Sequence, residues 1–202
     1  MAKVAMNKGA LQKERDKLRL YRRVLPSLDL RRRQLTAEAS RAREALAQVE
    51  VTLKQQNAVI AAQLPMLANP HIEVSGLLQI ESVQLGEDNV VGVKLPVLTS
   101  LQCAVRDYSL LAKPHWVDVL VARLQEIVTL RLQIRIAAER VRRLEQAGRR
   151  ATQRVNLFDK ILIPQTEKTI QRIQIALGDA ERAAIVRSKL AKGRSHPAAT
   201  DR

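Results

Sequence analysis

The first third of the chain carries a seven-residue repeat that limits what the chain can fold into. Eight of the nine positions in one register are apolar, the exception being Arg32. A second register, three residues further along, is apolar in its middle and polar at both ends. The first register consists of Leu11, Leu18, Leu25, Arg32, Ala39, Leu46, Leu53, Ile60 and Leu67, and the second of Glu14, Tyr21, Leu28, Leu35, Ala42, Val49, Gln56 and Gln63. Because such a seam is buried against a partner helix, the pattern predicts a left-handed coiled coil.

Prolines interrupt this N-terminal repeat and mark its end. As a single helix it would measure roughly 85 Å at the rise of an α-helix. Since a proline inside a helix removes a hydrogen bond and bends the rod, we expect a kink or a break at Pro26. Pro65 and Pro70 close the helix, and Asn69 is its expected exit.

A second helical repeat follows Pro114, a residue that fits the first turn of a helix. Its registers are Leu120, Ile127, Ile134, Val141, Gly148, Val155 and Leu162, and Leu130, Ala137, Leu144, Ala151 and Phe158. Beyond Pro164 the apolar positions shift by one residue, which alters the local supercoil without ending the helix. The tail from Lys192 to Arg202 is expected to fray.

The region between the two repeats changes period. Residues 91–97 alternate in type: Val91, Gly92, Val93, Lys94, Leu95, Pro96 and Val97. This two-residue period predicts a half-buried strand, and residues 80–85 form a weaker strand candidate. Turn-forming residues stand between them: Gly86, Glu87, Asp88 and Asn89. We therefore expect a β-hairpin that turns at 86–89, with the strand of Pro96 at an edge because proline cannot donate to a ladder.

Two helices of comparable length in one chain bury their seams most simply against each other. The predicted fold is therefore mainly α, a long antiparallel two-helix coiled coil with a short mid-chain β-hairpin and a connecting region. We expect an N-terminal coiled-coil helix over 1–69, the hairpin and connecting region over 70–113, a C-terminal coiled-coil helix over 114–192 and a flexible tail over 193–202. One Trp, one Phe and two Tyr in 202 residues disfavour a β-sandwich or a doubly wound α/β enzyme. Trp116 is interpreted as a packing plug where the connecting region meets the helices.

The charge is concentrated at the two ends of the chain. Lysine and arginine number 35 against 20 acidic residues, a formal net charge of +15. Residues 1–43 carry +9 and residues 113–202 carry +10, whereas residues 70–112 carry −3. An antiparallel pair brings the two basic ends together, and because this concentration of charge repels itself, it favours an acidic partner surface.

Several function classes lack the residues they need. Cys103 is the sole cysteine, so neither an intramolecular disulfide nor a cysteine-based zinc site is expected. The histidines, His71, His115 and His196, are far apart and have no ligands at metal-binding spacing. A nucleotide-binding P-loop is absent, and we expect neither catalysis nor a cofactor. With no secretory signal and no membrane span, we expect a soluble, cytoplasmic protein.

Two stretches resemble the D subunit of the V-type/A-type rotary ATPases. The stronger is residues 149–177, RRATQRVNLFDKILIPQTEKTIQRIQIAL, with the motif positions Arg154, Val155, Asn156, Ile161, Leu162, Ile163 and Pro164. The second is residues 87–97, EDNVVGVKLPV, which is similar to the hairpin segment of the family and includes Asn89, Gly92, Val93, Lys94 and Pro96. A weaker match is Asn7 followed by a helix rich in leucine and basic residues. Together the matches cover most of the chain in the same order.

The resemblance implies a rod of paired helices, the central rotor stalk, along the axis of an alternating ring of catalytic A and regulatory B subunits. It further implies that the F subunit clamps the mid-chain portion and that the C (d-type) subunit seats it on the membrane ring. A stalk of this kind is non-catalytic and peripheral to the membrane. It transmits torque between ATP chemistry in the ring and translocation of H⁺ or Na⁺.

Arginine runs on both helices are the candidate torque contacts, because arginine at an interface engages carboxylates of the ring. They are Arg31, Arg32, Arg33, Arg142, Arg143, Arg149, Arg150 and Arg154. The simpler interpretation of such runs is a solvated helix face. Asn156 is open to two interpretations, a polar group that sets register in the seam or a partner contact.

Two alternatives come from other classes. A basic coiled coil with a pI near 10.9 also suits a nucleic-acid-binding protein, which would show salt-sensitive binding to random DNA. The near absence of aromatic residues for stacking disfavours this function. A coiled-coil adaptor of another ring ATPase, such as the flagellar export apparatus, shares the architecture, but the hairpin segment disfavours it.

Overall fold

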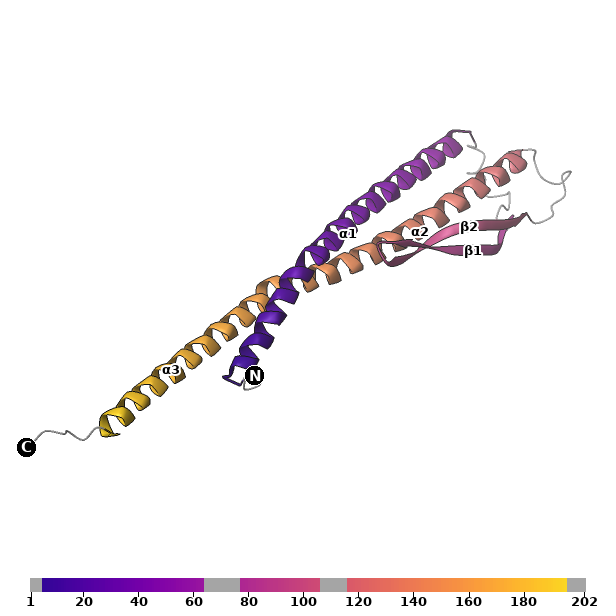
Figure 1. The fold of residues 1–202 in the computed structure, drawn as a ribbon. Coiled ribbons are helices and arrows are strands. Elements are labelled where there is room, and N and C mark those ends of the chain that lie inside the picture. The colour runs from indigo at the N-terminus through magenta and orange to yellow at the C-terminus, as the bar shows by residue number, and fades with distance from the viewer. Residues whose placement is uncertain (1–4, 64–76, 106–115, 196–202) are drawn as a thin grey trace, which may run out of the picture. The chain divides into compact units, whose positions relative to one another are not determined.

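A computed structural model describes residues 5–63, 77–105 and 116–195 (Figure 1). In chain order the elements are α1 (Lys8–Gln63), β1 (Leu78–Val90), β2 (Val93–Val105), α2 (Trp116–Asn156), the π-helical turn η2 (Leu157–Leu162) and α3 (Ile163–Ser195). The chain is mainly α-helical with an antiparallel hairpin in its middle, which confirms the predicted fold class. None of the helices in these described ranges is long and apolar enough to cross a membrane.

The chain divides into two compact units. The first combines the chain up to Leu30 with the chain from Ala151 onward, and the second spans Arg31–Arg150. The first unit therefore holds the beginning of α1, the end of α2, η2 and α3. The second holds the rest of α1, the hairpin and most of α2.

Helix α1 runs through Pro26 without a break, so of the two predicted outcomes, a kink or a break, the break is wrong. Pro26 lies on the exposed side of the helix, whereas its neighbours Leu25 and Leu28 are partly buried in the seam. The proline ring is therefore placed on the solvent side of the helix, away from the seam. The helix begins at an Asn7 cap, whose Oδ1 accepts a 2.7 Å hydrogen bond from the backbone N–H of Ala10. The predicted exit at Pro65–Pro70 lies outside the described residues.

In the first unit the two ends of the chain pair in antiparallel fashion. Lys8 forms an ion pair with Glu181 at 3.7 Å, and Arg22 forms one with Glu167 at 2.6 Å. From Lys8 to Arg22 the position in α1 increases while the position of the paired residue in α3 decreases, so the two helices run antiparallel. Between the helices, the rings of Tyr21 and Phe158 pack edge to face with centroids 5.4 Å apart. Ile173 is fully buried in this unit, so α3 contributes to its core.

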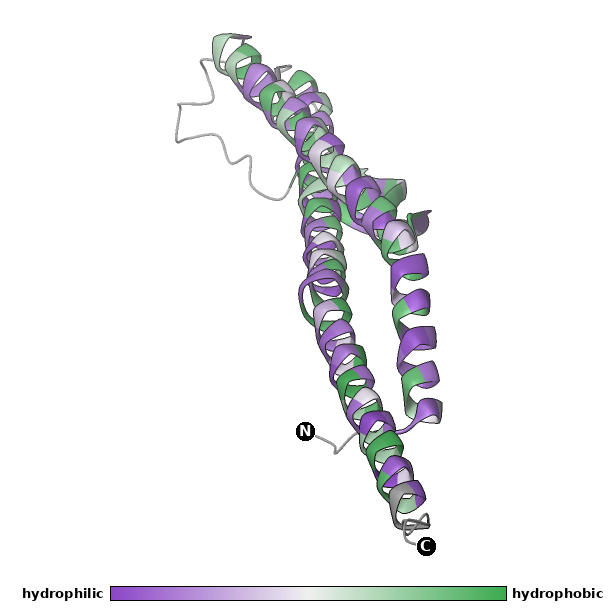
Figure 2. Ribbon diagram, turned by 60° about the vertical axis from the view of Figure 1, so that its left-hand side comes forward, coloured by the Kyte–Doolittle hydropathy of each residue, from purple (hydrophilic) through white to green (hydrophobic). Residues whose placement is uncertain are grey.

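The second unit repeats the antiparallel arrangement with α1 and α2. Arg43 of α1 donates a 2.9 Å hydrogen bond from Nε to Glu145 of α2. At the other end of these helices, a core cluster joins Ile60 to the first turns of α2. It consists of Ile60, Leu77, Trp116, Val117, Leu120 and Val121. Trp116 is part of this core, as its interpretation as a packing plug requires. Figure 2 shows apolar and polar residues interleaved along the helices.

The hairpin turns at a different place from the one predicted. Its two-residue turn is Val91–Gly92, with φ angles of 52° and 76°, so the residues 86–89 belong to β1. A turn with positive φ at both central residues matches the twist of the flanking strands, and Gly92 adopts it without strain. The turn formers are held in the strand by cross-strand pairing, for example Glu87 with Lys94 at 2.9 Å.

The one-residue shift in the C-terminal repeat corresponds to the π-helical turn η2. The backbone N–H of Ile163 donates to the carbonyl of Phe158, five residues back, instead of the usual four. Such a turn accommodates one extra residue in an otherwise continuous helix. Pro164, which follows directly, has no N–H for an α-helical bond, so the local α-helical ladder is weakened there in any case.

Candidate partner-binding surfaces

The seam positions are partly or fully buried, which removes them from the candidate contact surfaces. Ile60 and Val155 are buried. The partly buried seam residues are Leu18, Leu25, Leu46, Leu53, Ile127, Ile134, Val141 and Leu162. Ile60 and Ile127 pack in the core cluster of the second unit, and the burial of the other seam residues favours more exposed positions as partner contacts.

Several of the arginines singled out in the sequence bind groups of this chain. Arg142 and Arg143 both bind the carboxylate of Glu139, with Nε–O distances of 2.7 and 2.8 Å. These two guanidinium groups lower the pKa of Glu139 to about 2. Arg149 pairs with Glu145 at 3.3 Å, and Arg31 donates a 3.4 Å hydrogen bond to the carbonyl of Val91 in the hairpin turn.

The remaining arginines of that set fall into two groups. Arg32 and Arg33 each interact with another group of the chain. Arg150 and Arg154 are exposed, and neither has a hydrogen bond or ion pair to any part of the chain that the structure describes. Arg150 and Arg154 are therefore the members of the set whose charges are available to a partner.

Arginines of α2 hold the hairpin at its second strand. Arg143 donates a 3.0 Å hydrogen bond to the carbonyl of Lys94, and Arg140 donates one of 3.2 Å to the carbonyl of Pro96. Arg140 also lies 3.5 Å from the carboxylate of Asp88. Sequence reasoning missed Arg140, although its spacing of three residues from Arg143 places both on one helix face.

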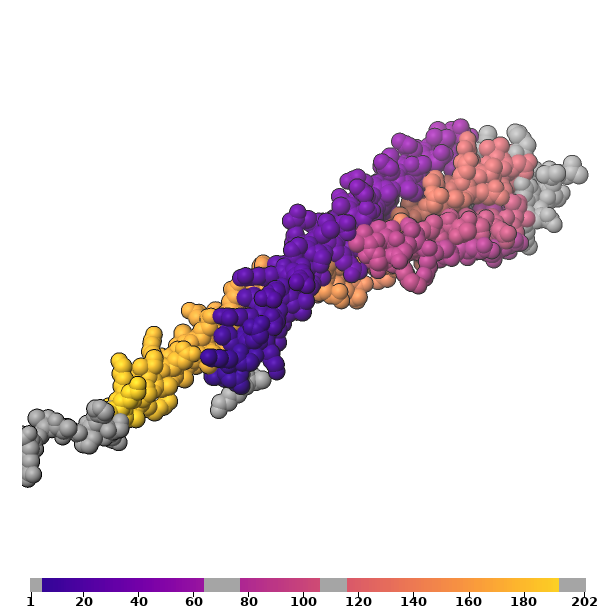
Figure 3. Space-filling view, viewed as in Figure 1, coloured from indigo at the N-terminus to yellow at the C-terminus, as the bar shows by residue number. Residues whose placement is uncertain are grey.

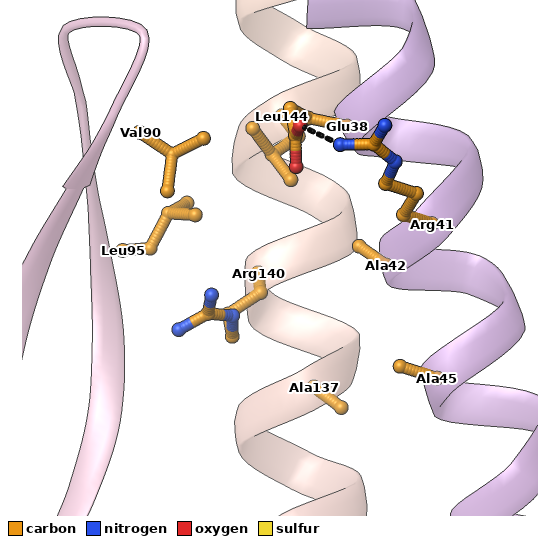
Figure 4. Close-up of a pocket in the computed structure, with 9 residues that line it drawn as sticks. All are labelled: Glu38, Arg41, Ala42, Ala45, Val90, Leu95, Ala137, Arg140 and Leu144. Atoms are coloured by element: carbon orange, nitrogen blue, oxygen red, sulfur yellow. Dashed lines mark hydrogen bonds and ion pairs between the residues drawn. The ribbon is translucent and has the colours of Figure 1, made fainter.

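Two hollows flank the hairpin where it meets the helices. A cavity of about 210 Å³ lies between the hairpin, α1 and α2, and in Figure 4 Leu95 and Val90 face it from the hairpin while Arg140 points from α2 toward the hairpin. It is also lined by Glu38, Arg41, Ala42, Ala45, Ala137 and Leu144. A wider groove of about 490 Å³ lies between α2 and the hairpin residues Leu85 and Pro96.

An exposed stripe of mixed character runs along η2 and α3 in the first unit. Leu157, Ile161 and Ile175 are 43%, 53% and 58% exposed. Lys168 and Arg172 are exposed and have no ion-pair partner among the described residues. The spacings of four, seven, four and three residues place these five side chains on one side of the helix. We call them the outer stripe.

The remaining motif residues lie around these surfaces. Asn156 is exposed, which puts it outside the buried seam and favours a contact role over a register role. Ile163 and Pro164 are partly buried beside η2. Asn89, Gly92, Val93, Lys94 and Pro96 form the tip of the hairpin. Within the described ranges, histidine, cysteine and carboxylate side chains form no group of three or more that could hold a metal ion.

Comparison with known proteins covers both units of the chain. The family model for the D subunit of ATP synthase matches residues 10–193. The V-type ATP synthase D subunit of Borreliella burgdorferi is 29% identical over 192 residues, covering 95% of each chain. The proteins of the same name from Chlamydia abortus and Chlamydia felis are 33% and 32% identical over 193 residues, covering 95% of this chain and 93% of their own. The chain therefore belongs to the ATP synthase D-subunit family, which includes the D subunits of V-type ATP synthases.

Proposed function

We propose that this protein is the central shaft of a V-type rotary ATPase and transmits torque between the catalytic ring and the membrane ring. The observation that carries the proposal is the antiparallel pairing of helices within each unit of a protein of this family, through Arg22–Glu167 between the two ends of the chain and through Arg43–Glu145 between α1 and α2. A pair of helices packed along a hydrophobic seam resists twisting in a way that one isolated helix does not. In this role the chain is a non-catalytic part of the machine.

The outer stripe, together with Arg154 of the same unit, is a surface that contacts the ring in this proposal, and Arg150 of the other unit is a separate ring contact. Torque requires an outward face that differs from one side of the shaft to the other. The stripe combines exposed leucine and isoleucine side chains, which pack against apolar ring residues, with cations that lack partners in the described chain. Unpaired arginine and lysine attract ring carboxylates without first giving up an internal ion pair.

The same proposal assigns the partners of the chain. The A and B subunits form the surrounding ring, the F subunit binds the mid-chain portion and the C (d-type) subunit joins the shaft to the membrane ring. The chain is then held on the cytoplasmic side of the membrane through this complex. The exposed apolar side chains of the hairpin, among them Ile80, Val83 and Leu85, support an interface in the mid-chain portion.

A double charge reversal in the outer stripe tests the proposal. The Lys168→Glu/Arg172→Glu variant keeps both seams, so the chain folds and enters the complex. Because both reversed charges then repel ring carboxylates, ATP-driven ion pumping is expected to fall at least tenfold while ATP hydrolysis persists. Pumping is measured in reconstituted vesicles by an ion-sensitive dye, alongside phosphate release.

The matched control is Lys54→Glu/Arg131→Glu, which reverses two exposed charges of the other unit that also lack partners among the described residues. It is expected to pump like the unmodified protein. Full coupling in the outer-stripe variant would contradict the assignment of this surface. Strong binding of random DNA by the isolated chain at physiological salt would instead support the nucleic-acid alternative.

A further inference from the structure

The hairpin is attached to α2 along one edge. Within the described residues, the hydrogen bonds from α2 to the hairpin backbone go to β2, from Arg143 to the carbonyl of Lys94 and from Arg140 to the carbonyl of Pro96. Arg140 also reaches the side chain of Asp88 in β1, but not its backbone. Residues Lys94 and Pro96 are two positions apart, so their carbonyls point in the same direction. Near the turn, α2 therefore binds the outward carbonyls of β2.

The register of the turn shows which backbone groups point outward. With the two-residue turn at Val91–Gly92, the pair Val90–Val93 is hydrogen-bonded, and the bonded and non-bonded pairs then alternate. Glu87–Pro96 and Asn89–Lys94 are the non-bonded pairs, whose N–H and C=O groups point away from the partner strand. The arginine contacts to Lys94 and Pro96 agree with this alternation. Proline is tolerated at position 96 because the backbone nitrogen there points away from β1, so the ladder loses no hydrogen bond.

The equivalent groups of β1 lie on the opposite edge of the hairpin. The backbone N–H and C=O of Glu87 and Asn89 have no hydrogen-bond partner within the described ranges. Nearby side chains on the same strand are also uncovered, since Ile80 is 53%, Val83 38% and Leu85 57% exposed. In Figure 3 the hairpin lies along α2 with one long side open to solvent. A strand edge of this kind is a template for pairing with another chain.

We propose that residues 85–90 of β1 pair with an extended, basic segment of another subunit of the assembled ATPase, which adds a third strand to the hairpin. The inference rests on the proposed function, because it places the partner strand in the same complex. Register shifts between Ile80 and Ser82 and between Gln84 and Leu85 break the edge on one side, and the turn ends it on the other. The partner strand is therefore short.

Charge decides between a partner subunit and a second copy of this chain. β1 contains Glu81, Glu87 and Asp88 and no lysine or arginine. Glu87 pairs with Lys94 and Asp88 with Arg140, but the side chains of these two acids stay 62% and 50% exposed. Pairing of two β1 edges would bring carboxylates together, and like charges directly opposite destabilise a sheet. Because exposed ion pairs are weak, lysine or arginine of an added strand can share these carboxylates with Lys94 and Arg140. The added strand also stabilises the hairpin, since two strands alone are marginal in water.

Hydrogen–deuterium exchange read at single residues tests the pairing in the protein as it exists. The amides of Glu87 and Asn89 are followed in the isolated chain and in the complete ATPase purified with all its subunits. Both amides are expected to exchange at least a hundredfold more slowly in the complex. If both exchange equally fast in the isolated chain and in an intact, coupled complex, the strand pairing is wrong while the shaft function stands.

Two variants at one position identify the kind of contact. Asn89→Pro removes an outward N–H without touching the hairpin ladder, and its control Asn89→Thr keeps that N–H. The proline variant is expected to lose at least tenfold of the protection at Glu87 in the complex, and the threonine variant to keep it; equal protection in both would overturn the pairing. The amides of Asp88 and Val90 are hydrogen-bonded within the hairpin, so their slow exchange verifies that each variant is folded. If a variant is not folded, the comparison of the unmodified protein alone and in the complex decides whether the strand pairing exists.

The charge-swapped variant Glu87→Lys/Lys94→Glu tests the basic character of the partner. It keeps the ion pair between the two strands but places the positive charge on β1. Protection at Asn89 is expected to fall at least threefold in the complex. Unchanged or increased protection would overturn the assignment of a basic strand. A failure of the shaft function itself would appear separately, as full coupling in the outer-stripe variant.

Discussion

At the scale of single residues, several arginines of this protein bind groups of the same chain and are not reserved for partner subunits. Arg140 and Arg143 bind backbone carbonyls of β2, and Arg31 binds the carbonyl of Val91. The planar guanidinium suits this role because it presents several donors in fixed directions. The contact at Val91 holds a residue whose φ of 52° is uncommon for a β-branched side chain. The tip of the hairpin is thus strained and held in place.

Relief of that strain is a prediction at the same scale. Val91→Asn is expected to stabilise the hairpin by about 1 kcal/mol, because asparagine followed by glycine is the preferred pair for this turn. The measurement is amide exchange of β1 and β2 in the isolated chain, which should slow about fivefold. The control Val93→Asn changes a residue just outside the turn and is expected to bring no such gain. Faster exchange in the Val91 variant would show that the valine is not strained.

At the scale of elements, the sequence predicted what depends on periodicity and missed what depends on contacts. The heptad positions around Leu35 and Leu144 indicated the buried sides of the helices, and both residues are buried. The turn of the hairpin was misplaced because the turn propensity of residues 86–89 is a local signal, whereas the pairing of Glu87 with Lys94 is made across strands.

The same division explains two other outcomes. The break predicted at Pro26 is absent because the proline lies on the exposed side of α1, a fact that the composition of the helix does not reveal. Arg140 escaped notice because its partners, Pro96 and Asp88, are more than forty residues away in the sequence. By contrast, the shift of apolar positions near Pro164 predicted a helix that continues with a changed period, and the π-helical turn is where the structure holds the extra residue.

The π-helical turn leads to a prediction about deletions. Removal of Lys160 together with Pro164→Ala should convert η2 into ordinary α-helix and keep Phe158 and Ile173 in one seam, because the turn holds one residue more than the repeat needs. The melting temperature is expected to change by less than about 5 °C. The control deletes Gln171 with the same Pro164→Ala change. It should rotate Ile173 out of the seam and lower the melting temperature by about 10 °C or more. Equal destabilisation by both deletions, read by circular dichroism, would contradict this description of η2.

At the scale of the whole molecule, different parts of the surface have different tasks in the proposed shaft. The seams join the antiparallel helices within each unit, the outer stripe faces the ring, and β1 offers an edge to a neighbouring subunit. The charges follow this division, since Arg142 and Arg143 are occupied by Glu139 whereas Lys168 and Arg172 lack partners in the described chain. A basic protein of this family therefore does not present all of its positive charge to one partner.

Rotation of the chain inside the ring is the most direct measurement of the central claim. The ring is fixed to a surface, and a bead is attached to a cysteine introduced as Lys54→Cys in a Cys103→Ser background. On addition of ATP the bead is expected to turn in one direction relative to the ring, and to stop when ATP is withdrawn. A bead that stays still while the same immobilised complexes hydrolyse ATP would contradict the proposed shaft function.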